Sequence, residues 1–598
     1  MQTQKYTVNQ QLIGTLLSWV RSGEIAIPEI QRPFVWDSAN VRNLMDSLYQ
    51  GFPVGYIIAW RNPNIRLKDG TFSEGKKILI DGQQRITALK AAILGDYVTN
   101  KEYQQIKIKI AFHPVEGKFE VQNPAILRDK TWVPDISELF KPGVNSFAII
   151  SQYLEQNPEV KQEIIVESFG RLFELSQKQI GMIELASDLD IETVTEIFIR
   201  INSKGVVLSQ ADFAMSKIAA NEIYGGNTLR KAIDYFCHLA IAPEFFQFIR
   251  DNDKNFAQTP YFQKMSWIKD EVEDLYDPSY SDLLKVAFTL EFNRGKLSDL
   301  VSLLSGRNFE TRTFEEAIAE ESFKRLGNGV MNFINENHFK KFVMIIKSCG
   351  FIIPGMINSQ SSLNFAYILY LKLRELKENQ AKIEGYVKRW FIFSLLTGRY
   401  SGSAESVFDF DIRQIAEKPF EEILGEKEAG ELSDAFWNAA LVQHLDTTSR
   451  NSPYFSVFLA AQVKNHEKGF LSKDVTVHDL IALRGDIHHI FPKDHLKKSG
   501  VAKSKYNQIA NYVFMQSEIN IQVGNHSPKA YFDILLQQLR DGNFRFGSIT
   551  TESGLKANLE MNCIPEIVME MEGNRYDEFL IARRKLMSLK IKEYYFGL

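Results

Sequence analysis

The stretch Gly-Asp-Ile-His-His-Ile-Phe-Pro, residues 485–492, contains two adjacent histidines, His488 and His489. Successive side chains of an extended strand point to opposite faces, so these two imidazoles would face opposite sides. One can bind a metal ion while its neighbour acts as a base, or one of them is merely structural. Seven of the ten histidines of the chain lie in residues 441–598, and they are His444, His466, His478, His488, His489, His495 and His526.

Two asparagines follow this stretch. Asn511 leads the apolar run 511–514, and Asn520 comes nine residues later. Hydrolysis of a phosphodiester with one metal ion needs an imidazole that deprotonates water, nitrogen or oxygen ligands for the cation, and a group that orients the imidazole. Asn520 would supply an oxygen ligand from a following helix. The alternative is a buried strand end with satisfied histidines, but the spacing of all these residues favours a catalytic site.

The charge around the histidine pair is positive. Residues 484–505 contain six basic and two acidic side chains, a local excess of four positive charges in a chain with a net charge of −4. Such a patch can bind a phosphate backbone, although a solvated lysine loop is the alternative. The predicted DNA contacts are Arg484, Lys493, Lys497 and Lys498.

At these residues the C-terminal part resembles the HNH nucleases, which have a ββα-metal fold. It resembles in particular the HNH subgroup that follows a GmrSD-type N-terminal domain. The resemblance implies that His489 is the general base, that His488 and Asp486 compete for the role of metal ligand, and that Asn520 is the second ligand. It also implies that Asn511 orients the base or braces its loop.

A second motif, Asp81-Gly82-Gln83-Gln84-Arg85, lies where an apolar strand at 78–80 meets a helix marked by Ile86, Leu89 and Ile93. An arginine in the first turn of a helix is unfavourable unless an anion lies nearby, because a helix begins with free N–H groups and a partial positive charge. Gly82 allows a close backbone approach, and Arg85 can bind a phosphate with two hydrogen bonds. A capped helix with an exposed arginine is the alternative.

Together with the motif Ile-Pro-Glu-Ile-Gln-Arg-Pro-Phe-Val-Trp at 27–36, this turn resembles the GmrSD N-terminal family, which shares a ParB/sulfiredoxin-like fold. A third similar element is Phe-Ile-Arg-Ile-Asn-Ser-Lys-Gly at 198–205, where a helix–turn–helix corner without ligand contact is the alternative. The resemblance implies a site for a nucleoside triphosphate (GTP, ATP or CTP). Its residues would be Gln31, Arg32, Asp81, Gly82, Gln83, Gln84, Arg85, Arg200 and Asn202.

The bulk properties limit the class of protein. A length of 598 residues exceeds what one hydrophobic core usually holds. The net charge gives no global signal for nucleic acid. Three widely separated cysteines exclude a disulfide framework and a four-cysteine zinc site, which fits a reducing cytoplasm. The N-terminus lacks a signal-peptide pattern, and no apolar run reaches about 18 residues, so we expect a cytoplasmic protein without membrane spans.

Local patterns predict further elements. Apolar residues recur with helical spacing at 41–48 and at 194–201, the alternating segment 106–112 predicts a half-buried strand, and residues 215–440 have helical patterns. The sequence therefore predicts a multidomain α+β protein. Its domains would be a ParB/sulfiredoxin-like nucleotide-binding domain at 1–215, a helical linker domain at 216–440, and a ββα-metal (HNH) nuclease domain with C-terminal helices at 441–598.

The function that the resemblance to the GmrSD-type family implies is a nucleotide-regulated, modification-dependent endonuclease that acts on foreign double-stranded DNA such as modified phage DNA. Its cofactors would be Mg²⁺ or another divalent cation and a nucleoside triphosphate, and NTP hydrolysis and a homodimer are further expectations. Two alternatives stay open: a nucleotide-gated DNA-binding regulator, and an NTPase whose nuclease needs a partner protein.

Overall fold

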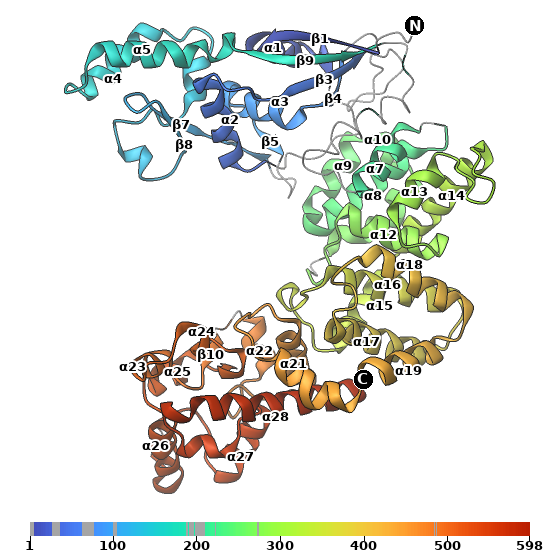
Figure 1. The fold of residues 1–598 in the computed structure, drawn as a ribbon, viewed down its shortest axis with the longest axis vertical. Helices are drawn as coiled ribbons and strands as arrows, with labels where there is room; N and C mark the ends of the chain where they lie inside the picture. The colour runs from blue at the N-terminus through green and yellow to red at the C-terminus, as the bar shows by residue number, and fades with distance from the viewer. Residues whose placement is uncertain are drawn as a thin grey trace. The chain divides into compact units, whose positions relative to one another are not determined.

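The computed structural model describes residues 5–26, 36–61, 77–99, 105–186, 189, 197, 210–221, 223–271, 274–483, 485, 487–543 and 545–598. The chain divides into two compact units, 1–230 and 231–598. The first unit combines a sheet with helices, and the second is almost entirely helical (Figure 1). The protein is therefore a multidomain α+β protein, as predicted. The predicted boundaries at 215 and 440, like the ParB/sulfiredoxin-like fold, stay predictions.

The first unit is built on a five-stranded sheet with the strand order β1-β9-β3-β4-β2. β9 lies antiparallel to β1 and parallel to β3, while β4 lies antiparallel to β3 and parallel to β2. Side chains alternate between the two faces of β3, so that Ile57 and Ala59 enter the main core and Ile58 and Trp60 enter a smaller cluster. The strands are β1 (Tyr6–Leu12), β2 (Ile25–Ala26), β3 (Tyr56–Arg61), β4 (Lys77–Asp81) and β9 (Gln179–Leu185).

Helices cover the face of this sheet that holds the main core (Figure 1). Their apolar residues form one continuous cluster with the sheet. The remaining elements of the unit are α1 (Ile13–Ser22), α2 (Ser38–Gln50), α3 (Gln83–Leu89), the π-turn η1 (Lys90–Leu94), β5 (Val98–Thr99), β6 (Gln105–Ile106), β7 (Ile110–His113), β8 (Lys118–Val121), the short 3₁₀ turns η2 (Ile126–Arg128), η3 (Ile136–Phe140) and η4 (Glu174–Gln177), α4 (Ser146–Gln156), α5 (Gln162–Phe173) and α7 (Gln210–Ala220).

The helix predicted at 41–48 is confirmed as α2. Asp37 caps it by accepting a hydrogen bond from the backbone N–H of Asn40 at 2.7 Å, and Gly51 ends it with a φ of +76°. The strand at 78–80 is confirmed as part of β4, and the helix at 86–93 as α3 with η1. Of the stripe predicted at 194–201, only Ile197 lies within the described residues.

The single strand predicted at 106–112 is wrong. The segment contributes to two strands, β6 and β7, with 107–109 between them. β6 pairs with β5, whereas β7 pairs with β8. The choice of partner strands, rather than the alternation of lysine and isoleucine, thus determines where each strand ends.

The second unit is helical from its start, which confirms the helical patterns of the middle of the chain. In α16, every residue from 362 to 373 is buried, so this helix forms the centre of the unit, packed against α12 and α17. The helices up to residue 431 are α8 (Gly226–Ile241), η5 (Pro243–Phe245), α9 (Phe246–Asn252), α10 (Lys254–Ala257), α11 (Pro260–Lys264), η6 (Ser266–Asp270), α12 (Tyr280–Phe292), α13 (Leu297–Leu304), α14 (Glu316–Phe333), α15 (Glu336–Ser348), η7 (Pro354–Met356), α16 (Gln360–Glu375), α17 (Gln380–Thr397), α18 (Ala404–Glu417) and α19 (Phe420–Glu431).

The last helix, α28, packs against helices of the middle of the chain, such as α17, and against the segments that surround the hairpin, such as η9. The Tyr594 hydroxyl near its end donates to the backbone carbonyl of Cys349 at 2.6 Å, and that of Tyr576 at its start donates to the carbonyl of Lys505 at 3.1 Å. The elements after 431 are η8 (Phe436–Ala440), α20 (Leu441–His444), α21 (Pro453–Lys464), α22 (Val477–Ala482), β10 (Ile487–His489), α23 (Lys493–Lys498), α24 (Lys503–Tyr506), η9 (Ile509–Asn511), β11 (Tyr512–Phe514), α25 (Ser517–Val523), α26 (Pro528–Asp541), α27 (Glu552–Met561), η10 (Glu566–Glu570), η11 (Gly573–Arg575) and α28 (Tyr576–Phe596).

Within the described ranges, every helix is too short or too polar to cross a membrane.

Candidate active site

The two adjacent histidines lie on β10, which pairs antiparallel with β11. His488 is opposite Val513 and His489 is opposite Tyr512. The His488 side chain is buried, whereas His489 on the other face is partly exposed. The predicted strand and the predicted opposite orientation of the two imidazoles are thus confirmed. Asp486, the predicted neighbour, lies outside the described residues.

His489 is held by contacts on two sides. Its Nε2 lies 3.2 Å from the amide oxygen of Asn507, and its ring packs edge-on against the ring of Tyr512 with 5.2 Å between centroids. Burial lowers the pKa of His489, the hydrogen bond that the imidazole donates to the Asn507 oxygen partly offsets this effect, and the positive charges of Arg450 and Lys493 lower the pKa further. The imidazole is therefore poised in its neutral form, which is the form that can accept a proton.

Asn511 is fully buried and uses its whole amide as a brace. Its Oδ1 accepts from the Phe491 backbone N–H at 2.8 Å, and its Nδ2 donates to the carbonyls of Phe491 and Tyr506, each at 3.1 Å. These bonds fasten the end of β10 to the chain that enters β11. Of the two roles that the sequence left open for Asn511, the contacts match the bracing of the loop.

Sequence patterns did not single out Arg450, which lies on the same side of the hairpin as His489. Its guanidinium lies over the ring of Tyr512, 5.1 Å from the centroid, so one aromatic ring contacts both Arg450 and His489. Among the described carboxylates, none forms an ion pair with this exposed guanidinium. An exposed guanidinium that is oriented by an aromatic ring is suited to binding a phosphate.

Asn520, a predicted metal ligand, lies on α25 and is partly buried. The described residues contain no cluster of three His, Cys, Asp or Glu side chains that could hold a metal ion. The predicted ligands, however, are one imidazole, one amide oxygen and one carboxylate, of which Asp486 is outside the described part. This donor set suits Mg²⁺ or another oxygen- and nitrogen-binding divalent cation.

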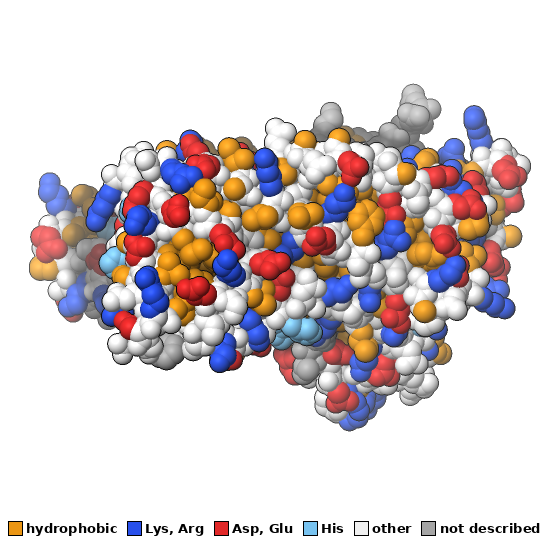
Figure 2. All heavy atoms as spheres, turned by 90° about the horizontal axis from the view of Figure 1, so that it is seen from below, with side chains coloured by type: hydrophobic (Ala, Val, Ile, Leu, Met, Phe, Trp, Pro, Cys, Tyr) orange, Lys and Arg blue, Asp and Glu red, His pale blue; other side chains and the backbone are white. Residues whose placement is uncertain are grey.

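The predicted DNA-contacting lysines Lys493, Lys497 and Lys498 are exposed on α23. Lys497 forms a surface ion pair with Asp494 at 3.2 Å, and Arg484 lies outside the described residues. Figure 2 shows a face on which basic and acidic side chains are interspersed. The DNA contacts predicted at Arg484, Lys493, Lys497 and Lys498 stay a prediction.

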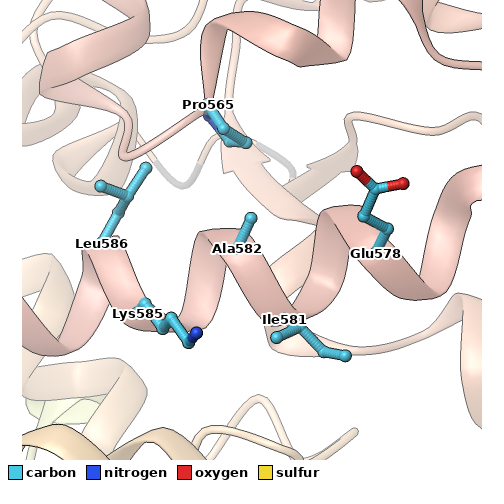
Figure 3. A pocket seen from close by; sticks show the side chains of 6 residues that line it. All are labelled: Pro565, Glu578, Ile581, Ala582, Lys585 and Leu586. Carbon is cyan, nitrogen blue, oxygen red and sulfur yellow. The ribbon is translucent and has the colours of Figure 1, made fainter.

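A shallow hollow of about 430 Å³ lies on α28. Ile581, Ala582 and Lys585 line it from the helix, and Pro565 faces them (Figure 3). None of the predicted site residues lines this hollow, and it contains no imidazole. It is therefore separate from the candidate active site.

In the first unit, the predicted turn lies between β4 and α3. Gly82 has a φ of +94° and precedes the helix without a side-chain cap. Arg85 lies over Gly55 and Gly82 and donates to the carbonyl of Tyr56, and Gln84 accepts a bond from the Trp36 N–H at 3.4 Å. Asp81 and Gln83 are partly exposed at the same junction. Outside the described residues lie Gln31, Arg32, Arg200 and Asn202.

The fold and these sites define a class: a multidomain α+β protein whose C-terminal hairpin presents a partly exposed imidazole with a lowered pKa beside the guanidinium of Arg450. Comparison with known families makes this more specific. Residues 13–219 match the family described as "GmrSD restriction endonuclease, N-terminal domain". The predicted GmrSD-type resemblance is thereby confirmed for this part of the chain.

A relative extends the comparison over the whole chain. An uncharacterized protein from Methanocaldococcus jannaschii is 21% identical, and the alignment covers 96% of this chain and 96% of the relative. Its name assigns no activity. The HNH assignment of 441–598 therefore stays a prediction.

Proposed function

We propose that this protein is a metal-dependent DNA endonuclease that restricts foreign DNA, with His489 as its general base. The observation that carries the proposal is the environment of His489: a neutral, partly exposed imidazole, hydrogen-bonded on one side and flanked by Arg450. The match of residues 13–219 to a restriction endonuclease family supports DNA as the substrate. Recognition of modified DNA and regulation by a nucleotide-binding first unit are further parts of this proposal.

The chemistry follows from the residues of the hairpin. Neutral His489 removes a proton from a water molecule, the water oxygen attacks phosphorus, and the bond from phosphorus to the leaving oxygen breaks. Arg450 and Lys493 would hold the negatively charged phosphate. Asn511 keeps the hairpin in place through its backbone contacts.

A divalent cation, when bound, would stabilise the negative charge that develops on the phosphate. His488, Asn520 and Asp486 would hold it.

Cleavage of supercoiled plasmid and of hydroxymethylated or glucosylated phage DNA by the purified full chain tests the proposal. We expect cleavage with Mg²⁺ or Mn²⁺ and none with EDTA. The assay is run with and without GTP, ATP and CTP. DNA binding without cleavage under every condition would favour the DNA-binding regulator, and NTP hydrolysis without cleavage would favour the NTPase that needs a partner.

The pH dependence of cleavage tests the state of His489. Because the protonated imidazole cannot accept a proton, activity falls as the pH drops through the pKa of His489. Burial and positive neighbours lower this pKa from 6.5, so the acid limb of the rate profile is expected below pH 6.5. Arg450→Ala removes one of these charges and is expected to move the limb to higher pH. An acid limb above pH 6.5 in the wild type would contradict the assignment.

The nucleotide proposal is tested at Arg85. Removing a charge-assisted contact to a phosphate usually costs about 1.5–3 kcal/mol, so Arg85→Ala is expected to weaken nucleoside triphosphate binding about 10- to 100-fold. The matched control is Arg42→Ala, because Arg42 forms a surface pair with Glu120 on α2 and β8. Equal affinities of the two variants, measured by calorimetry, would exclude Arg85 from the nucleotide site.

A further inference from the structure

Within the described part of the chain, Asn507, immediately after α24, makes a side-chain hydrogen bond with His489. Its Oδ1 lies 3.2 Å from His489 Nε2. An amide oxygen only accepts hydrogen bonds, so Nε2 must carry the proton in this contact. In a neutral imidazole, the other nitrogen then has the free lone pair.

We infer that Asn507 is a positioning residue that fixes neutral His489 as the Nε2–H tautomer and so makes Nδ1 the atom that receives the proton of the attacking water. This inference rests on the proposed nuclease function. The proton passes from water to Nδ1, while the water oxygen forms the new bond to phosphorus. Asn507 itself keeps its hydrogen bond and exchanges no proton.

The backbone around Asn507 is fixed by neighbouring elements. The carbonyl of Tyr506 accepts from Asn511 Nδ2 at 3.1 Å, and the backbone N–H of Ile509 donates to the carbonyl of Thr447 at 2.9 Å. The Tyr506 side chain is buried, which anchors the residue just before Asn507. Anchored neighbours on both sides allow a single amide to set the orientation of the imidazole.

The groups that face His489 make a defined tautomer necessary. Among the described residues, the charged groups that act on His489 are Arg450, Lys493 and His488, and in their charged forms they cannot accept a hydrogen bond from Nε2. Without the amide oxygen, the imidazole could turn over or carry its proton on Nδ1, and then no lone pair would face the water. Loss of the Asn507 amide should therefore lower the rate of the chemical step rather than the affinity for DNA.

The test compares Asn507→Ala with Asn507→Asp and with the control Gln508→Ala, an adjacent amide whose nitrogen donates to the carbonyl of Ser504 instead. Asn507→Ala is expected to lower kcat roughly 10- to 100-fold with KM unchanged, within the range that base catalysis contributes. Asn507→Asp keeps an acceptor at the same position and is expected to restore most of kcat. Equal kcat values of Asn507→Ala and Gln508→Ala would overturn the inference.

A second measurement does not depend on cleavage. Nitrogen NMR of the metal-free full chain, with ¹⁵N-labelled histidine and His489 assigned by its loss in His489→Gln, reports the tautomer directly. We expect Nε2–H in the wild type and in Asn507→Asp, and a mixture in Asn507→Ala. If His489 of the wild-type protein carries its proton on Nδ1, the inference is overturned even when the protein is an active nuclease. The expected tautomers in a protein without cleavage would instead count against the nuclease proposal alone.

Discussion

Replacement of His489 by alanine is expected to lower the rate of DNA cleavage roughly 10²- to 10⁴-fold, the contribution of a general base. The imidazole is the titratable side chain on β10 that is both partly exposed and predominantly neutral near pH 7. Its loss leaves Arg450 and Lys493 in place, so the variant is expected to bind DNA with nearly unchanged affinity. A plasmid-cleavage time course together with a DNA-binding titration separates the two effects.

The matched control for this experiment is His526→Ala. His526 is an exposed histidine between α25 and α26, so its loss removes an imidazole from the same part of the chain without touching the hairpin. We expect wild-type cleavage from His526→Ala. Cleavage by His489→Ala at the rate of this control would remove His489 from the mechanism, whereas equal losses in both variants would point to general damage to the fold.

Sequence patterns predicted the elements of the candidate site but not its contacts. The order of β10, β11 and α25 follows from short apolar runs, which act locally and can be recognised in one segment. Arg450 and Arg583 reach the hairpin from segments outside it, and Asn507 lies within the long connection between β10 and β11. No local periodicity marks any of the three. Such contacts depend on how the helices pack, which the sequence pattern does not encode directly.

The same distinction applies to the first unit. The helix α2 was predictable because its buried residues recur with helical spacing and because Asp37 and Gly51 mark its ends. The division of the segment 106–112 between β6 and β7 was not predictable, because β5 pairs only with β6 and β8 pairs only with β7. Pairing with other strands overrides the alternating pattern that the segment has by itself.

Arg583 shows how strongly the hairpin depends on a distant residue. It is 1% exposed, and its guanidinium donates to the carbonyls of Ala510 and Tyr512, each at 2.8 Å, and to that of Asn562 at 3.1 Å. Burial lowers the pKa of Arg583 only to about 10, so it stays charged at neutral pH. The residue thereby ties α28 and the end of α27 to the strand that carries Tyr512, against which His489 packs.

Arg583→Met is therefore expected to lower the free energy of unfolding of the second unit by about 3–5 kcal/mol, because three buried carbonyls lose their donor at roughly 1–3 kcal/mol each, partly offset by the apolar replacement. Arg583→Lys is expected to recover part of this loss, since one ammonium cannot reproduce the fork of a guanidinium. Urea unfolding followed by tryptophan fluorescence measures the effect. The control is Arg575→Met, which breaks an exposed pair with Glu578 and should change the stability little, because solvent screens such pairs. Equal urea midpoints for Arg583→Met and Arg575→Met would show that the buried guanidinium does not stabilise the hairpin.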